Sequence, residues 1–156
     1  MTRQFVRARL VQARCDDDGN AIVEFVYLAV LLMVPLVYVL LTVFRVQGAS
    51  YAVSSAAREA GRVFATSDAV DDAGPRAMTA ARIVMRDSNL AFAPEDMEIT
   101  CSSTPCLEPG SHVNVVIAYD VSLPLLPRIF DGQAPATVRV SSRHLEVVDR
   151  FRAAAR

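Results

Sequence analysis

The hydrophobic pattern of the chain begins with one long apolar run. From Phe25 to Phe44 about twenty residues are interrupted only by Thr42, which is roughly the length that a helix needs to cross a bilayer. A helix is the expected form, because lipid offers no partners for backbone N–H and C=O groups. Small apolar residues then recur at alternating spacings of four and three, so we expect the helix to continue outside the membrane. These residues are Ala49, Val53, Ala56, Ala60 and Val63.

A second helix should follow after a loop. Thr66-Ser67-Asp68 is expected to end the first helix, and Asp71-Asp72-Ala73-Gly74 is typical of a loop. Pro75 should then open the second helix, since proline is tolerated at the first helical position. Asn89 or the approach to Pro94 should end it. Its expected apolar side consists of Met78, Ala81, Ile83, Val84 and Met85.

The last third of the chain changes to a period of two, which is typical of strands with one buried face. The clearest strand runs from Val113 to Val121, and a shorter one from Met97 to Cys101. Glu108-Pro109-Gly110-Ser111 is expected to form the turn between them. A third strand is predicted from Thr137 to Val148, with a bulge at Ser141-Ser142, where the apolar phase shifts.

These elements predict an α+β fold. It would have a long N-terminal helix whose first half is transmembrane, a second helix, and a small three-stranded antiparallel sheet packed on the outer half of the long helix. The segment 124–135 should be a long loop folded back over the core. Residues 45–156 would make one domain, of about the commonest domain size.

An acid stands immediately before the apolar run. Glu24 precedes Phe25 directly and follows Gly19 by five residues. A carboxylate near the bilayer costs a few kcal/mol, less toward the interface, so a segment that served only as an anchor would gain nothing from it. Glu24 is therefore either an interfacial carboxylate that reaches the headgroups or a charge partner for another chain.

Gly19, Glu24, Phe25 and the apolar run together resemble the processing site of type IV prepilins. In that family a prepilin peptidase cuts after the glycine, which implies cleavage between Gly19 and Asn20 and loss of a cytoplasmic leader, residues 1–19. The resemblance also implies that Glu24 neutralises the new amine on Asn20 of an adjacent subunit.

Two further features narrow the resemblance to TadE-like pseudopilins of the Flp/Tad pilus. One is Glu24 followed by Phe25, and the other is the stretch Ala56-Ala57-Arg58-Glu59-Ala60. The resemblance implies a pilin-like fold and a minor subunit or assembly factor of a Flp/Tad-type pilus. Its expected partners are the prepilin peptidase, other pilins and pseudopilins of the same system, and the lipid bilayer.

Charge near the apolar run predicts the orientation of the protein in the cytoplasmic membrane. Arginines precede the run at positions 3, 7, 9 and 14, and positive residues favour the cytoplasmic side. The N-terminus should therefore lie inside, residues 20–44 in the membrane, and residues 45–156 outside, at the pilus base or in the fibre.

Three cysteines fit this orientation. Cys15 would leave with the leader, while Cys101 and Cys106 would remain outside, where disulfides persist. A disulfide between them would close a short loop and stabilise the domain by about 2 kcal/mol. The alternative is two free thiols, and the pair is a poor metal site without a nearby histidine.

Composition argues against several kinds of chemistry. The net charge of −1 gives no general case for nucleic acid, and all 16 basic residues are Arg, which excludes lysine chemistry. His112 and His144 lie on predicted strand edges with no nucleophile in a catalytic motif, and Asp16-Asp17-Asp18 lacks the spacing of a calcium loop. We therefore expect no enzyme, cofactor, metal or small-molecule substrate. The main alternative is a single-pass, signal-anchored extracytoplasmic binding or sensor domain that is not incorporated in a fibre; an anchored hydrolase is disfavoured.

Overall fold

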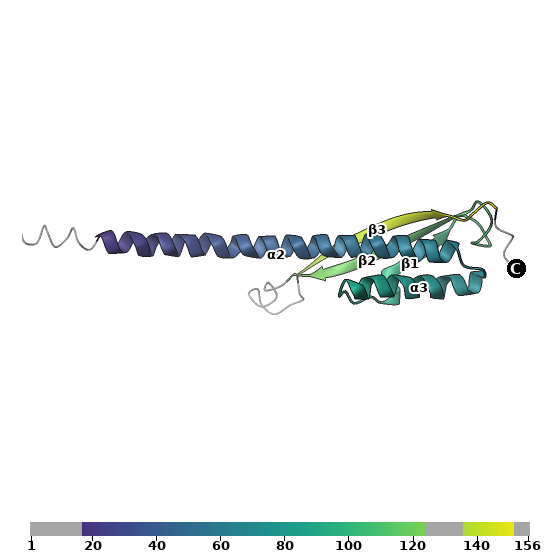
Figure 1. Cartoon of the computed structure of the whole chain (residues 1–156), viewed down its shortest axis with the longest axis horizontal. Helices are drawn as coiled ribbons and strands as arrows, with labels where there is room; N and C mark the ends of the chain where they lie inside the picture. The colour runs from purple at the N-terminus through teal and green to yellow at the C-terminus, as the bar shows by residue number, and fades with distance from the viewer. Residues whose placement is uncertain (1–16, 124–135, 152–156) are drawn as a thin grey trace, which may run out of the picture. The chain divides into compact units, whose positions relative to one another are not determined.

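A computed structural model describes the backbone of residues 17–123 and 136–151, with side chains from residue 21 onward (Figure 1). In chain order the elements are α2 (Asp17–Ala65), α3 (Val70–Asp87), the 3-10 helix η1 (Pro94–Asp96), β1 (Met97–Cys101), β2 (His112–Ser122) and β3 (Thr137–Val147). The predicted α+β class and order of elements are confirmed. The chain divides into two compact units, Met1–Leu41 and Thr42–Arg156. Residues 1–16 of the predicted leader, which include Cys15 and Asp16, and the predicted loop 124–135 lie outside the described residues.

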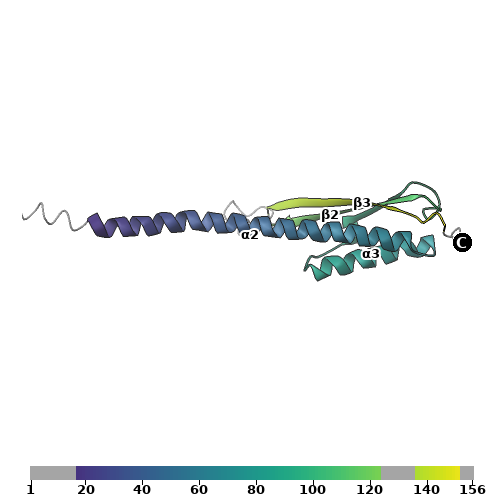
Figure 2. The ribbon, with the colours of Figure 1, turned by 45° about the horizontal axis from the view of Figure 1, so that its top comes forward.

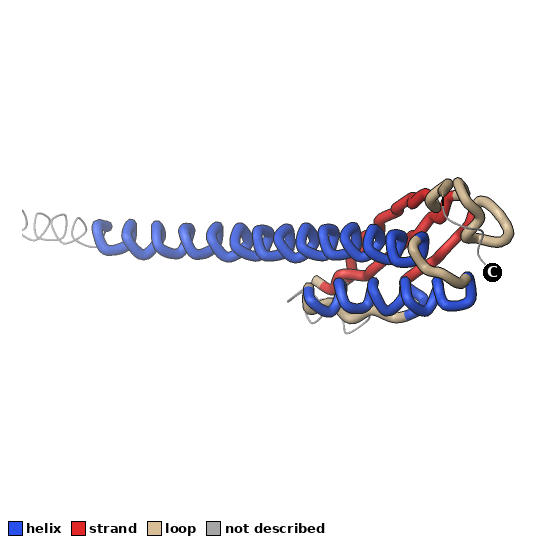
Figure 3. Tube along the Cα trace, turned by 45° about the vertical axis from the view of Figure 1, so that its right-hand side comes forward, coloured by secondary structure: helices blue, strands red, loops and turns tan. Residues whose placement is uncertain are grey.

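The second unit is built of two layers. Its sheet has the strand order β1-β2-β3, and both pairings are antiparallel (Figure 2). Two helices cover one face of the sheet: α3, and the part of α2 that belongs to this unit (Figure 3). The predicted strand Met97–Cys101 is confirmed residue for residue. β2 exceeds the predicted strand by one residue at each end.

Small side chains on the helices meet larger ones on the sheet. Alanines on both helices are fully buried, which lets the two layers approach closely, and branched residues of β2 fill the space between them. The expected apolar stripe of α2 is confirmed at Ala49, Val53, Ala56 and Ala60, whereas Val63 is only half-buried. The fully buried residues of the core are Ala56, Ala57, Ala60, Ala73, Ala77, Ala81, Met85, Leu107, Val113, Val115, Ile117 and Val148.

The end of α2 is where the sequence predicts it. Thr66 Oγ1 donates to the carbonyl of Arg62 at 2.8 Å, and Ser67 Oγ donates to that of Val63 at 2.7 Å. These hydroxyls bond to carbonyl groups of the last turn, where few helical donors remain; the carbonyl of Arg62 also accepts the backbone N–H of Thr66 at 3.0 Å. The helix ends at Ala65.

The start of α3 differs from the prediction. The helix begins at Val70, so Asp71–Gly74 is helical and Pro75 lies inside the helix. Asp71 and Asp72 favour a helix here because carboxylates in a first turn interact well with the helix dipole. Ala73 adds a turn of buried apolar surface, while Pro75 removes one hydrogen bond, to the carbonyl of Asp71.

The apolar side of α3 is also narrower than predicted. Its buried residues are Ala73, Ala77, Ala81 and Met85, at spacings of four. The predicted Val84 packs partly buried against the core, whereas Ile83 is 57% exposed. The predicted stop at Asn89 is confirmed, since this residue adopts a left-handed φ of 57°. The N–H groups of Asn89 and the next residue, Leu90, bond to the last carbonyls of α3 at 2.9 and 3.0 Å, which is a Schellman ending.

The predicted bulge in β3 is wrong. Ser141 pairs with Ala118 and Ser142 with Ile117, in unbroken register. The backbone stays regular, and the shift of the apolar phase instead changes which side chains lie on the exposed face. Beyond this point the apolar Leu145 lies on the exposed face, 55% exposed, while the polar residues His144 and Glu146 lie against Gly61 of α2.

Candidate functional site: the exposed helix and a charged groove

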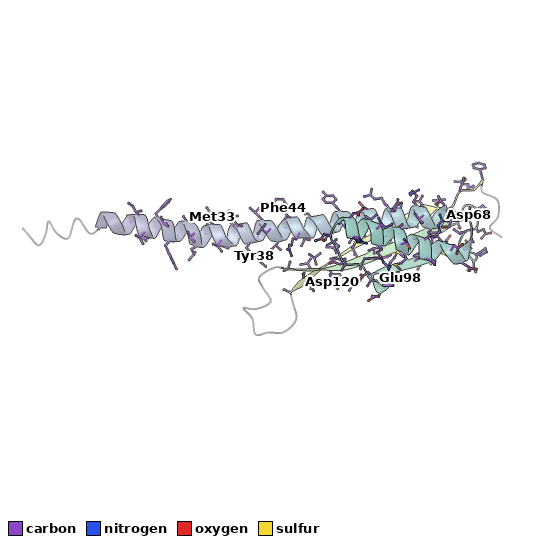
Figure 4. The ribbon with its side chains drawn as sticks, turned by 60° about the horizontal axis from the view of Figure 1, so that its bottom comes forward. Met33, Tyr38, Phe44, Asp68, Glu98 and Asp120 are labelled. Carbon is purple, nitrogen blue, oxygen red and sulfur yellow. A yellow bond between two sulfur atoms is a disulfide. The ribbon has the colours of Figure 1, made fainter. Side chains whose placement is uncertain are left out.

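One helix in the described part of the chain is long and apolar enough to cross a membrane, Ala21–Ala65. Its most apolar window has a mean hydropathy of 2.6, and none of that window is buried in the protein. Twenty residues at 1.5 Å each give about 30 Å, the thickness of the hydrocarbon layer. Met33, labelled in Figure 4, is 60% exposed, and Leu32 is 70% exposed. So large an apolar surface needs lipid or other protein chains to cover it.

The predicted site residues Gly19, Asn20, Glu24 and Phe25 all lie on the first turns of α2. Gly19 and Asn20 are described only as helical backbone. Glu24 and Phe25 are exposed, Phe25 to 72%. No hydrogen bond or ion pair connects Glu24 to another described residue, so its carboxylate is accessible to a group outside this chain.

The alanines and the charged residues of the TadE-like stretch lie on opposite faces of α2. Ala56, Ala57 and Ala60 are fully buried against the core, whereas Arg58 is exposed. The stretch therefore combines two roles: its alanines let the helix pack closely, and its charged residues form part of the surface of the domain.

The charged face is held by one ordered ion pair. Arg62 donates to both carboxylate oxygens of Glu59, at 3.0 and 2.6 Å. This hydrogen bonding lowers the pKa of Glu59 from its usual value of 4.5, with a smaller contribution from the charge of Arg62. Arg58 donates to the backbone carbonyl and hydroxyl of Ser54 at 3.4 and 3.2 Å, so no carboxylate among the described residues neutralises it.

These side chains line a groove of about 400 Å³ between α2 and β3. From α2 come Arg58, Glu59 and Arg62, and from β3 come His144 and Glu146, whose Nε2 and Oε2 atoms are 2.9 Å apart. With neutral histidine the two arginines and two glutamates balance in charge. The groove is thus suited to ionic contacts with another polar surface.

Gly61 explains why β3 approaches α2 so closely at this groove. A Cβ atom on Gly61 would lie 3.2 Å from His144 Cδ2 and 3.4 Å from Glu146 Cβ. His144 is half-buried on β3, an edge strand of the sheet, and its neighbours in the groove were not predicted. The only signal in the sequence was the shift of the apolar phase in β3. No group of three or more metal-binding side chains occurs in the described part of the chain.

Cys101 and Cys106 are joined by a disulfide, with Cα atoms 5.3 Å apart. The bridge links the end of β1 to the loop that precedes β2. Leu107, beside it, is fully buried, and Ser102 N–H donates to the carbonyl of His112 at 2.9 Å. The predicted pairing of the two cysteines is thus present, and the disulfide holds a loop that packs on the core through Leu107.

The chain matches no protein-family model, no curated protein and no solved structure. Its function must therefore be inferred from the apolar helix, the acid before it and the folded second unit.

Proposed function

We propose that this protein is a TadE-like pseudopilin, a minor subunit or assembly factor of a Flp/Tad-type pilus. It is made as a membrane-anchored precursor, with its N-terminus inside and residues 45–156 outside the cytoplasmic membrane. The observation that carries the proposal is α2 itself. One continuous helix bears an accessible acid, then an exposed apolar segment, then a face of small residues that packs on an antiparallel sheet.

The accessible acid supports assembly rather than simple anchoring. When the apolar segments of several subunits pack together, Glu24 moves from the membrane surface to a less polar environment. Such a transfer is unfavourable for an unpaired carboxylate. Two opposite unit charges 4 Å apart attract each other by about 4 kcal/mol near a protein surface. The amine on Asn20 of a neighbouring cleaved subunit would provide the positive charge.

Cleavage is the first test. Co-expression with a prepilin peptidase should remove the 19 residues before Asn20, roughly an eighth of the chain, and N-terminal sequencing should begin at Asn20. Gly19→Ala should block this cleavage. Gly48→Ala is the matched control, because a Cβ atom there meets nothing within 4 Å. Finding Met1 on the protein from cells that assemble pili would contradict the proposal and favour the anchored binding domain.

The charge of Glu24 is the second test. Glu24→Ala and Glu24→Gln should be cleaved and inserted normally but should lose co-purification with partner pilins. Glu24→Asp should be partly tolerated. Glu98→Gln, at an exposed position of β1, is the control for loss of a carboxylate. Normal pilus assembly by Glu24→Ala would show that the acid only faces the headgroups.

A further inference from the structure

We propose that a second groove of this protein binds the phosphate headgroup of a bilayer phospholipid. This groove has a volume of about 390 Å³ and lies entirely within the second unit. It is bounded by the start of that unit's part of α2, the loop after α3 and the end of β2. Phe44, Arg45 and Gly48 line it from α2, Leu90 from the loop, and Tyr119 and Ser122 from β2. The inference rests on the membrane span proposed above, but not on cleavage or pilus assembly.

The position of the groove along α2 matches the headgroup layer. The apolar run ends at Phe44. With a rise of 1.5 Å per residue, Arg45 and Gly48 follow that end by about 1.5 and 6 Å. The polar layer on each side of a bilayer is about 5–8 Å thick, since the whole bilayer measures 40–45 Å and its hydrocarbon about 30 Å. If residues 25–44 span the membrane, the helical wall of the groove lies at the depth of the phosphates.

The charge of the groove favours an anion. Arg45 is the sole charged residue among those that line it. Arg45 is exposed, and no described carboxylate pairs with it. Asp120, the residue after Tyr119 on β2, does not line the groove. Its Oδ2 atom pairs with Nη1 of Arg139 at 3.8 Å. A guanidinium group without a partner is well suited to a phosphate, which it can bind through two parallel hydrogen bonds.

The rest of the lining fits a lipid better than a free anion. Phe44, labelled in Figure 4, is 66% exposed at the end of the apolar run, and Tyr119 is half-buried. Leu90 adds apolar surface, and Ser122 provides an exposed hydroxyl. Aromatic residues of this kind are enriched at membrane interfaces. Phosphate beside Arg45 and the first carbons of the lipid beside Phe44 would satisfy both parts of the groove.

Gly48 leaves the groove open. A Cβ atom at this position would meet no atom within 4 Å, so a large side chain can occupy the groove without displacing the core. Gly48→Phe should therefore block the site, and Arg45→Gln should remove its charge. Gly74→Phe and Arg82→Gln are matched controls. Gly74 is a helical glycine with equally open space, and Arg82 is an exposed arginine that does not line this groove.

The test uses the full chain in detergent, titrated with dioctanoyl phosphatidylglycerol and followed by native mass spectrometry. Arg45→Gln should bind the lipid about tenfold or more weakly, because it loses charge-assisted hydrogen bonds to the phosphate. Gly48→Phe should abolish binding at this site, and both controls should bind like the wild type. Circular dichroism checks that Gly48→Phe is folded. If it is not, Arg45→Gln decides the matter, because its side chain is exposed.

Several results would overturn the inference. Equal binding by wild type, Arg45→Gln and Gly48→Phe would show that the groove does not hold the lipid. Equal binding of dioctanoylglycerol would show that phosphate is not recognised, and displacement by an equal concentration of inorganic phosphate would indicate a site for free anions. Extraction of the wild-type chain from membranes by alkaline carbonate would refute the membrane span and this inference together. A chain that stays embedded but remains uncleaved would refute only the pilin function.

Discussion

The two halves of α2 face opposite requirements. Up to Leu41 the helix carries large apolar residues on every side, and all its described side chains except Tyr38 are exposed. From Ala49 onward it carries small apolar residues on one face only, and these are buried. The size and distribution of apolar residues therefore indicate what will surround a helix. Lipid accommodates any side-chain shape, whereas a sheet at close distance admits only small ones.

The energetic roles of the two halves differ accordingly. Burial of an alanine methyl group contributes little free energy by itself, about 0.8 kcal/mol per carbon transferred from water. The small side chains of Ala56, Ala57 and Ala60 instead allow the sheet to approach the helix closely. Val115 and Ile117 can therefore reach the helix and become fully buried. The apolar side chains described in the first half, residues 21–41, are exposed except for the half-buried Tyr38, so their surface is available to whatever surrounds the protein.

The largest effect should come from a charge in the first half. Val34 is 63% exposed near the middle of the apolar run. Val34→Arg should disfavour membrane insertion by about 3 kcal/mol, measured as the fraction that resists carbonate extraction. Tyr51→Arg, at a position 76% exposed in the second half, should leave insertion unchanged. Equal insertion of both variants would show that the two halves do not differ in surroundings.

The second half should be sensitive to size instead. Ala60 is fully buried, so Ala60→Leu should destabilise the domain by about 1–3 kcal/mol through overpacking. Ala29→Leu adds the same atoms at an exposed position of the first half and should change nothing. Urea unfolding in detergent, followed by near-ultraviolet circular dichroism, measures the difference. If Ala60→Leu were tolerated, close packing of helix and sheet would not be needed.

The disulfide should affect the folded unit alone. Replacing both Cys101 and Cys106 by alanine should lower the free energy of unfolding by about 2 kcal/mol, because the bridge closes only a short loop. Membrane insertion should not change. The same urea titration and carbonate extraction give both values, and a fall in insertion would show that the second unit contributes to anchoring.

The smallest effect concerns Glu59. Its pKa is lowered by Arg62, so the pair stabilises the fold above pH 4.5 and loses this contribution as pH falls through the lowered value. Both side chains are substantially exposed, 60% for Arg62 and 38% for Glu59, and water and salt screen such pairs. Glu59→Gln should therefore change the urea midpoint only slightly at neutral pH, and the difference should shrink as the pH falls below 4.5 and Glu59 becomes protonated. A larger change would point to a role for the charged groove in folding.

Two stretches of α3 differ from the prediction for the same physical reason. Asp71–Gly74 has the composition of a loop, and only the burial of Ala73 against the rest of the core shows why the helix starts earlier. Ile83 has the spacing expected of an apolar residue on the buried side of α3. The sheet covers a narrower stripe of this helix, and Ile83 stays exposed. In both cases tertiary packing overrides local preference.

The sequence by itself determined the long apolar helix, the class and order of the elements, the three strands and the cysteine pair. These features depend on short-range periodicity and on residues close together in the chain, which sequence patterns record directly. Three features were decided only by the tertiary structure. The strand β3 runs without a bulge, and a groove opens beside Phe44 and Tyr119. Near Gly61, side chains of β3 also meet charged side chains of α2, and these residues are His144, Glu146, Arg58, Glu59 and Arg62. Such contacts join residues far apart in the chain, and their geometry follows from strand register and helix packing together.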